Sequence, residues 1–356
     1  MKILEKYKKL LKYILFIITT ICLLIIPVSI SKADIDDTVF LPILKIAIVN
    51  SYDIDHVCGT PQTQGIVDGL SNRIGRKFQF DIQVWYMKTG TTFDTQEKID
   101  YISKKVINDI KSFDPDYIFV VDDAAFKNVG IPMSESNMIF FTGLNKPFNS
   151  YGEIGTNFER FIGVEEIIPL ERLFRVLDNV EFYPSKIWIL ADTSTTSYFL
   201  SNSYRDEIKR DTKYDVEIIR LSRISDLRKT LSDLQKKKKG IIIHSYQNLK
   251  DDDYGMFRPK KQLIKEVLKY NKKHLDVCEN CYYAKNGISM VVAPDFYNMG
   301  LQVVGQFEDY LNNKVTERII QSKTIMSINI KRLEELGFSW MYRKIIEEVD
   351  SSYATY

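Results

Sequence analysis

The chain has 356 residues, of which 45% are hydrophobic, and a formal net charge of +2 at pH 7. The apolar content is sufficient for globular cores, and the length suits two lobes better than one. A nearly balanced charge argues against a strongly basic surface, so we expect no nucleic-acid partner. The lysine run at 236–239 is best explained as the solvated end of a predicted helix, where cations suit the helix dipole.

The first 33 residues have the pattern of an export signal. Lysines at positions 2–12 precede an uncharged apolar run, Ile14–Ile26, and Ser31-Lys32-Ala33 follows. A basic start, a short apolar stretch and small residues before the cleavage point are typical of a signal peptide, so we predict residues 1–33 as a signal peptide cleaved near Ala33. An uncleaved anchor is the alternative, although a membrane span needs about 20 residues. Either outcome predicts a periplasmic location for the rest of the chain.

From Leu44 onward, short apolar runs alternate with longer amphipathic segments. Thr60-Pro61 is a typical helix start, with Thr as the N-cap and Pro at the first helical position. In chain order, we predict the strand Leu44–Asn50, the helix Thr60–Ile74, the strand Phe78–Trp85, the helix Thr95–Ser112, and the strands Tyr117–Val121 and Met138–Thr142.

The same alternation restarts in a second block. We predict helices at Glu166–Asn179, Thr195–Arg210, Ser225–Lys236, Gln262–Lys272 and Phe296–Asn312, and strands at Lys186–Ala191, Val216–Leu221, Gly240–Ser245 and Ile288–Ala293. Nearly continuous apolar strands that alternate with helices indicate parallel sheets covered on both faces. The fold class is therefore α/β, with two blocks of the size of one doubly wound lobe each.

Three stretches resemble a known family. They are PDYIFVV at 115–121 with IFFTGLNKP at 139–147, Gly163 with YPSKIWIL at 183–190, and the segment 286–295 with INIKRLEELG at 328–337. In order and spacing they resemble the ABC-transporter substrate-binding proteins of the tryptophan/tyrosine type. The resemblance covers roughly residues 44–337, nearly the whole mature chain.

This resemblance implies a periplasmic-binding-protein fold of the first type. Two flavodoxin-like lobes would be joined by three crossover strands near Phe161–Gly163, Ala293–Asp295 and Ile325–Ile328. Lobe 1 is expected at 42–160 plus 295–323, and lobe 2 at 164–293 plus 324–356. The tail after Gly337 contains an additional predicted helix, Met341–Val349, which the family pattern does not explain.

The resemblance also implies a function. The protein would capture a small organic ligand, such as an amino acid, in the interlobe cleft and deliver it to the permease of an ABC importer. Hinge closure around the ligand is the usual motion of such proteins. The alternative is a ligand-sensing component that partners a membrane sensor kinase or cyclase.

Candidate ligand-binding residues come from one topological rule. Ligands of open α/β sheets bind beyond the carboxyl ends of the strands. The polar and aromatic residues at those ends are Ser51, Tyr52, Asp122, Thr142, Gly143, Thr193, Ser194, Thr195, Ser197, Tyr246, Asp295, Phe296 and Tyr297.

These candidates would have different roles. The hydroxyls of the 192–197 loop open a helix, where a ligand carboxylate binds well. Asp295, and after it Asp122, could bind an ammonium group, while Tyr and Phe rings could sandwich an apolar part of the ligand. The competing interpretations are helix capping for the hydroxyls and carboxylates, and ordinary packing for the rings.

The mature chain has three cysteines, and export favours their oxidation. We predict a disulfide between Cys278 and Cys281, whereas a bond from Cys58 to either of them and free thiols remain alternatives. His274, Cys278 and Cys281, completed by His56 or Cys58, have the residue types of a zinc site. Because no second C-x-x-C is present, we predict no metal.

Enzyme signatures are absent from the sequence. It contains no G-x-S-x-G elbow, no Walker loop and no H-E-x-x-H. A dehydrogenase would share the alternation of strands and helices, but the G-x-G-x-x-G after the first strand is missing, so we predict neither an enzyme nor a cofactor. His244, at a strand end, is better explained as a packed histidine than as a base.

Overall fold

The computed structural model describes residues 41–353, apart from 153, 155–156, 167–169, 212–213, 247–248, 254 and 257–258. The predicted signal peptide, residues 1–33, lies outside these residues. Within the described part of the chain, no helix is long and apolar enough to cross a membrane.

The first lobe is built on a six-stranded sheet whose strands are all parallel. Its order is β11-β5-β4-β3-β1-β2. The strands are β1 (Ile43–Asn50), β2 (Gln79–Tyr86), β3 (Tyr117–Val121), β4 (Ile139–Leu144), β5 (Phe161–Glu165) and β11 (Ile319–Gln321). The central strands β3 and β4 are almost entirely buried, because helices cover both faces of the sheet.

The second lobe contains a seven-stranded sheet with the order β13-β12-β10-β9-β8-β6-β7. Its strands are β6 (Ile187–Ala191), β7 (Val216–Arg220), β8 (Ile241–Ser245), β9 (Leu275–Cys278), β10 (Met290–Pro294), β12 (Thr324–Asn329) and β13 (Ser351–Tyr353). Only the pair β10–β12 is antiparallel.

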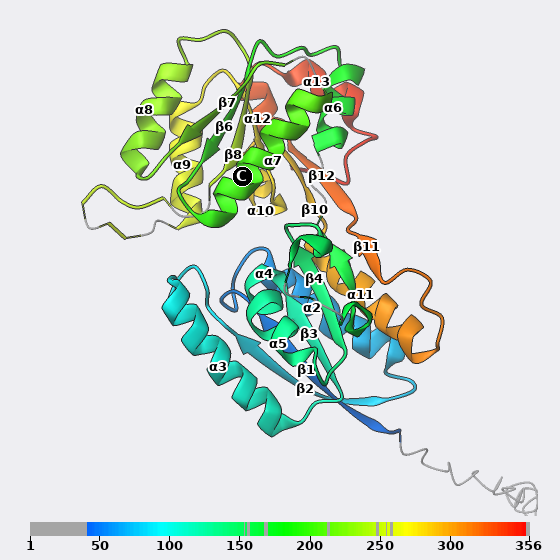
Figure 1. Cartoon of the computed structure of the whole chain (residues 1–356). Helices are drawn as coiled ribbons and strands as arrows, with labels where there is room; N and C mark the ends of the chain where they lie inside the picture. The colour runs from blue at the N-terminus through cyan, green and yellow to red at the C-terminus, as the bar shows by residue number, and fades with distance from the viewer. Residues whose placement is uncertain are drawn as a thin grey trace, which may run out of the picture. The chain divides into compact units, whose positions relative to one another are not determined.

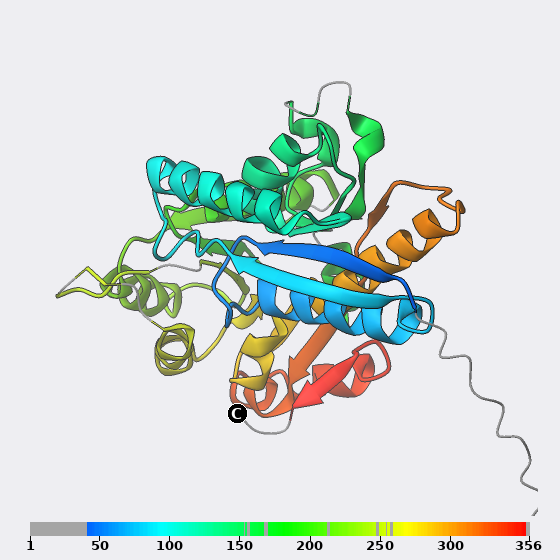
Figure 2. The ribbon, with the colours of Figure 1, turned by 90° about the horizontal axis from the view of Figure 1, so that it is seen from below.

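Helices cover both faces of each sheet (Figure 1). In the first lobe, Figure 2 shows α2 (Gly59–Gly69) and α3 (Gln96–Phe113) on opposite sides of the adjacent strands β1 and β2. Two separate apolar cores result, one between the sheet and α3 and one between the sheet, α2 and α11 (Phe296–Leu311). The second lobe also has two cores, which involve α6 (Leu170–Asn179), α7 (Thr195–Asp211), α8 (Ile224–Leu234) and α9 (Lys260–Tyr270).

The chain passes between the two sheets at three places. It leaves the first sheet after β5, returns between β10 and α11, and crosses again between β11 and β12. The crossings are hydrogen-bonded to one another, because Ser322 N donates to Glu165 O at 2.9 Å and Asp295 N donates to Lys323 O at 2.8 Å. The three crossings therefore form one hydrogen-bonded hinge between the two sheets.

The predicted fold class is confirmed, and most predicted elements occur with small shifts at their ends. The sequence reasoning missed the helical segment after β3, which comprises α4 (Asp122–Ala125), a π-helical turn and α5 (Ile131–Met133). It also missed the short pair β9 and α10 (Cys281–Lys285). The tail forms α12 (Ile330–Glu335), then α13 (Ser339–Ile345) where the helix Met341–Val349 was predicted, and last β13.

Helices α2 and α11 approach each other through glycines. A Cβ atom on Gly65 would lie 2.2 Å from Tyr297 O, and one on Gly300 would lie 2.2 Å from Gln62 O. The two backbones are therefore in direct contact, which explains Gly65 as a packing residue of this helix pair.

Replacing Gly300 with alanine should destabilise the first lobe. The added methyl group has no room between two backbones, and overpacking typically costs roughly 1–3 kcal/mol. Gly305 lies on the same helix, where a Cβ would make ordinary contact with the Arg73 side chain at 3.4 Å. Gly305→Ala should therefore be neutral or slightly stabilising, since alanine is the better helix former. Denaturant unfolding of the two variants checks this, and equal stabilities would contradict it.

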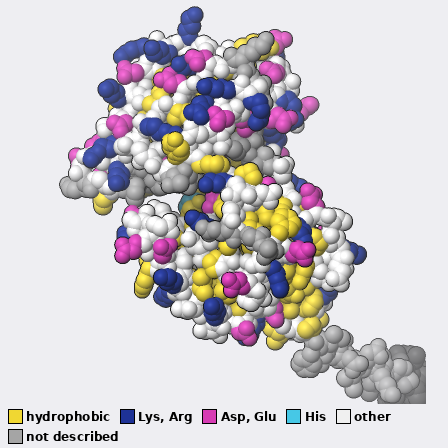
Figure 3. Space-filling model, viewed as in Figure 1, with side chains coloured by type: hydrophobic (Ala, Val, Ile, Leu, Met, Phe, Trp, Pro, Cys, Tyr) yellow, Lys and Arg dark blue, Asp and Glu magenta, His cyan; other side chains and the backbone are white. Residues whose placement is uncertain are grey.

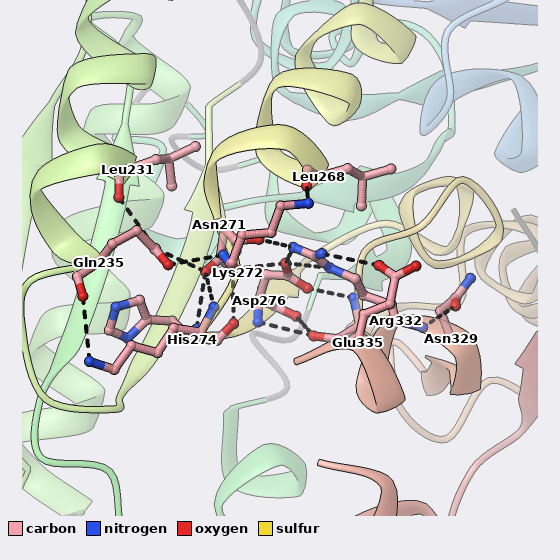
Figure 4. Close-up of polar contacts among 12 residues, drawn as sticks. Leu231, Gln235, Leu268, Asn271, Lys272, His274, Asp276, Asn329, Arg332 and Glu335 are labelled. Carbon is pink, nitrogen blue, oxygen red and sulfur yellow. Dashed lines mark hydrogen bonds and ion pairs between the residues drawn. The ribbon is translucent and has the colours of Figure 1, made fainter. Parts of the chain in front are cut away.

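A buried polar network joins β9 to α12 in the second lobe (Figure 4). Arg332 and Asp276 are both fully buried, and Arg332 Nη2 donates to Asp276 Oδ2 at 2.8 Å and to Asn271 O at 2.8 Å. Asn271 Nδ2 donates to Asp276 Oδ2 as well, and Ser289 N donates to Asp276 Oδ1. Both members of this ion pair therefore have additional hydrogen-bond partners, as a buried ion pair requires.

Candidate functional site

The carboxyl ends of β1, β3 and β4 are tied together by side-chain hydrogen bonds. Ser51 Oγ donates to Val121 O and accepts from Ala125 N, and Thr142 Oγ1 donates to Gln62 Oε1 at 3.0 Å. Gly143 has a φ of +85°, and a Cβ there would lie 2.7 Å from Gln62 Oε1. The hydroxyls of Ser51 and Thr142 therefore already have hydrogen-bond partners within the protein, and Gly143 packs closely against Gln62.

Two adjacent acidic residues, Asp122 and Asp123, lie at the same sheet edge, directly after β3. The Asp122 carboxylate is 4% exposed and accepts from Tyr52 Oη at 2.9 Å. Burial and the neighbouring charge of Asp123 raise the pKa of Asp122 to about 8. Burial also raises the pKa of Asp123 to about 6, although Asn145 and Tyr151 donate hydrogen bonds to it. Burial and repulsion within the pair therefore favour the protonated form of Asp122.

The loop after β1 folds over this pair. The ring of His56 stacks on that of Tyr52 with centroids 3.8 Å apart, and His56 Nδ1 accepts from the backbone amides of Cys58 and Gly59. Burial, together with the charge of Lys260, lowers the pKa of His56 to about 3. Burial raises the pKa of Cys58 to about 12, so both groups are uncharged at neutral pH.

In the second lobe, the ends of β8 and β9 and the starts of α9 and α10 form the facing edge. The side chain of Glu279, just after β9, accepts from the hydroxyl of the buried Tyr204. Lys260 Nζ and the hydroxyl of Tyr283 are buried without a hydrogen-bond partner among the described residues. The same holds for both ring nitrogens of His244 and for Ser245 Oγ, which lie at the end of β8.

The two edges face each other across the hinge. Asn280 Nδ2 donates to Val57 O at 3.3 Å and lies 3.5 Å from Cys58 Sγ, and Lys146 Nζ lies 5.1 Å from the centroid of the Phe199 ring. Glu166, directly after β5, lies among them. Burial and the charges of Asp122, Glu279 and Asp123 raise the pKa of Glu166 well above its usual value.

At the predicted anion site, residues 192–197, two of the serine hydroxyls already form hydrogen bonds within the protein. Ser197 Oγ donates to Ser245 O and accepts from Asp192 N, while Ser194 Oγ accepts from Ser197 N. Ser194 thus caps α7, and Thr193 is exposed. The side chain of Thr195 lies outside the described side chains.

The predicted residues around Asp295 also have partners inside their own lobe. The Asp295 carboxylate caps α11 by accepting from Asn298 N and Asn298 Nδ2. Tyr297 is 39% exposed and donates to Asp68 Oδ2, and Phe296 packs at the rim of the core between the sheet and α11. Tyr246, in contrast, is buried at the end of β8 against the His244 ring.

The cysteine segment differs from its prediction. Cys278 is a buried residue of strand β9 with a free thiol, so the structure does not contain a bond between Cys278 and Cys281. The Cys281 side chain lies outside the described side chains. His274 cannot join a metal site, because its Nδ1 accepts from Gly240 N and its Nε2 pairs with Leu234 O at 2.8 Å.

The strand-end rule names Tyr52 and Asp122 as candidates, but it does not name the other charged residues of this region. Glu166 and Glu279 follow β5 and β9, yet β9 was not predicted, and Glu166 was assigned to a helix that begins later, at Leu170. Lys260 belongs to the first turn of α9, where a lysine pair in a polar stretch gives no signal of burial. From the sequence, His56 and Cys58 were named only as alternative zinc ligands, and Cys58 also as an alternative disulfide partner.

Comparisons with known proteins show the fold. No family model matches the chain, and no curated protein matches it. Among solved structures, the chain is similar to an ABC domain in complex with L-Trp from Streptococcus pneumonia (TM-score 0.62, 14% identity, covering 87% of this chain and 99% of that one).

Two further structures have the same architecture. A ligand-free, open substrate-binding protein with adhesive properties from Clostridium difficile matches with a TM-score of 0.61 at 13% identity, covering 88% of this chain and 100% of that one. A putative LacI transcriptional regulator from Bacteroides fragilis matches with a TM-score of 0.54 at 10% identity, covering 80% and 96%. The chain therefore has the two-lobed α/β fold of these structures.

Proposed function

We propose that this protein is an extracytoplasmic solute-binding protein. It captures a small organic ligand that bears an amino group, such as an amino acid, between its two lobes and delivers it to the permease of an ABC importer. A cleaved signal peptide would place it in the periplasm, and it would perform no catalysis.

The observation that carries this proposal is the set of buried, incompletely paired polar groups where the lobes meet. Buried polar side chains are nearly always hydrogen-bonded, so each exception needs an explanation such as a bond to a ligand. Among the described residues, such exceptions are found at the facing edge of the second lobe, namely Lys260, Tyr283, Ser245 and His244. The similarity to substrate-binding folds supports the same conclusion.

Native mass spectrometry of the purified protein should reveal a co-purified small molecule, and a thermal-shift panel of amino acids and amines should then identify solutes that raise Tm. A ligand that binds only the folded state at 100 times its Kd adds about 2.7 kcal/mol of stability. That corresponds to a Tm increase of several degrees. A panel in which no solute changes Tm would contradict the proposal.

A signalling role would use the same ligand site, and the LacI-like neighbours show that this fold also occurs in regulators. Genome neighbourhood separates the two roles. A permease and an ATPase beside the gene favour import, whereas a sensor kinase or cyclase favours signalling.

A further inference from the structure

The interlobe site is acidic. Among the described residues, four carboxyl groups lie there, those of Asp122, Asp123, Glu166 and Glu279. The charges of Asp122, Asp123 and Glu279 all act on Glu166. Those of Asp122, Glu166 and Glu279 also act on Cys58. Two lysines act on the same site. The positive charge of Lys260 acts on His56 and Cys58, and that of Lys146 acts on Asp123. Elsewhere, on the face shown in Figure 3, basic and acidic side chains are interspersed.

Side-chain hydrogen bonds already reach three of these groups, from Tyr52 to Asp122, from Asn145 and Tyr151 to Asp123, and from Tyr204 to Glu279. Hydrogen bonds from neutral donors do not cancel the charge of several neighbouring carboxylates, and removing such carboxylates from water is costly unless cations compensate them. Without a ligand, protons can neutralise part of the cluster. A ligand with positive groups would replace those protons with charge-assisted hydrogen bonds, which are the stronger interaction.

Two unpartnered groups point independently to a ligand at this place. Tyr283 is 5% exposed, its hydroxyl has no hydrogen-bond partner among the described residues, and it interacts electrostatically with Glu279 and with Cys58 of the opposite lobe. Lys260 Nζ is buried beside Cys58 and Glu279, and within the described part of the chain it has no hydrogen-bond partner either. A ligand carboxylate between the lobes would satisfy Lys260, and Tyr283 could donate to it or accept from an ammonium group.

Aromatic rings complete the surroundings. Tyr52 stacks with His56 on the first lobe, and Tyr204 and Tyr283 lie on the second. Tyrosine faces attract organic cations, most strongly where water is excluded.

We propose that the ligand is an α-amino acid with a cationic side chain. Its carboxylate would pair with Lys260, and its two positive groups would pair with carboxylates of the cluster, chiefly Asp122, Glu166 and Glu279. This inference rests on the proposed solute-binding function and narrows its ligand class.

Isothermal titration calorimetry on the purified protein tests this with L-arginine, L-lysine, L-leucine, L-tryptophan, L-glutamate and 1,5-diaminopentane. L-Arginine or L-lysine should bind about 10- to 100-fold more tightly than the neutral amino acids, the factor expected from one more charge-assisted hydrogen bond. L-Lysine should also bind more tightly than 1,5-diaminopentane, which lacks the carboxylate.

Variants test which residues bind the positive groups of the ligand and which residue binds its carboxylate. Glu166→Gln should weaken L-lysine binding by about 10- to 100-fold, and Asp122→Asn is a second variant if that protein does not fold, as judged by its Tm. Lys260→Met should weaken L-lysine but leave 1,5-diaminopentane unchanged. Asp109→Asn, which removes an exposed carboxylate from α3, is the matched control and should change nothing.

The outcomes separate this inference from the proposed function. Tightest binding of L-leucine, L-tryptophan or L-glutamate would overturn the cationic ligand class but leave solute binding intact. Tighter binding of 1,5-diaminopentane than of L-lysine would overturn the pairing with Lys260. So would a Lys260→Met variant that binds L-lysine as tightly as the wild type does. If no solute binds and none co-purifies, the proposed function fails as well.

Discussion

Arg332→Met should destabilise the second lobe by about 3–5 kcal/mol, the usual result of removing one partner from a buried ion pair. The substitution leaves the Asp276 carboxylate fully buried without its cation and deprives Asn271 O of a donor. Chemical denaturation, with the free energy of unfolding extrapolated to water, measures the loss.

Two comparisons make this prediction specific. Arg228→Met removes a bidentate pair with Glu266 that is partly exposed, so it should cost less than about 1 kcal/mol. The double variant Arg332→Met/Asp276→Asn removes both charges and should be more stable than Arg332→Met alone. A double variant that is less stable than Arg332→Met would show that the buried charge is not the cause.

Asp122→Asn should make the ligand-free protein more stable at pH 8 and nearly unchanged at pH 4. Asp122 keeps its proton in the folded state up to about pH 8, whereas an unfolded aspartate loses it near pH 4. Between these values the folded state binds more protons than the unfolded state, so stability falls as pH rises. Asparagine mimics the protonated carboxyl and still accepts from Tyr52.

The expected gain at pH 8 is on the order of 1–3 kcal/mol, since one unit of pKa difference corresponds to about 1.4 kcal/mol and Asp123 shares the titration. Thermal unfolding of both proteins at pH 4 to 8 measures it. Asp109→Asn, the exposed control, should keep the wild-type pH profile. A variant whose stability falls with pH as steeply as that of the wild type would contradict the assignment to Asp122.

Much of the fold could be predicted because it follows from local patterns. Strand β3 begins and ends at the predicted residues, since YIFVV is apolar throughout and is flanked by the polar residues Asp116 and Asp122. Strand β9, LDVC, could not be recognised. It is four residues long and contains Asp276, whose burial depends on Arg332, 56 residues later in the chain.

The candidate site was predictable to a smaller degree. Tyr52 and Asp122 follow strands of one sheet, so the strand-end rule identifies them from the sequence. Ser194 and Ser197 of the 192–197 loop satisfy the same rule, but the Ser194 hydroxyl caps α7 and the Ser197 hydroxyl donates to Ser245 O. Sequence patterns do not reveal which polar groups already have a partner.

The sequence by itself therefore determined the α/β class, the order of the elements and one edge of the site, because periodicity and turn residues act over a few positions. Tertiary structure alone decided that Glu166, Lys260 and Glu279 meet Asp122. The order of strands in the first sheet brings Glu166 there, and the hinge crossings bring Lys260 and Glu279, which lie more than a hundred positions after Asp122. It also decided their charge environment, because desolvation depends on which surfaces cover a carboxylate and not on its sequence neighbours.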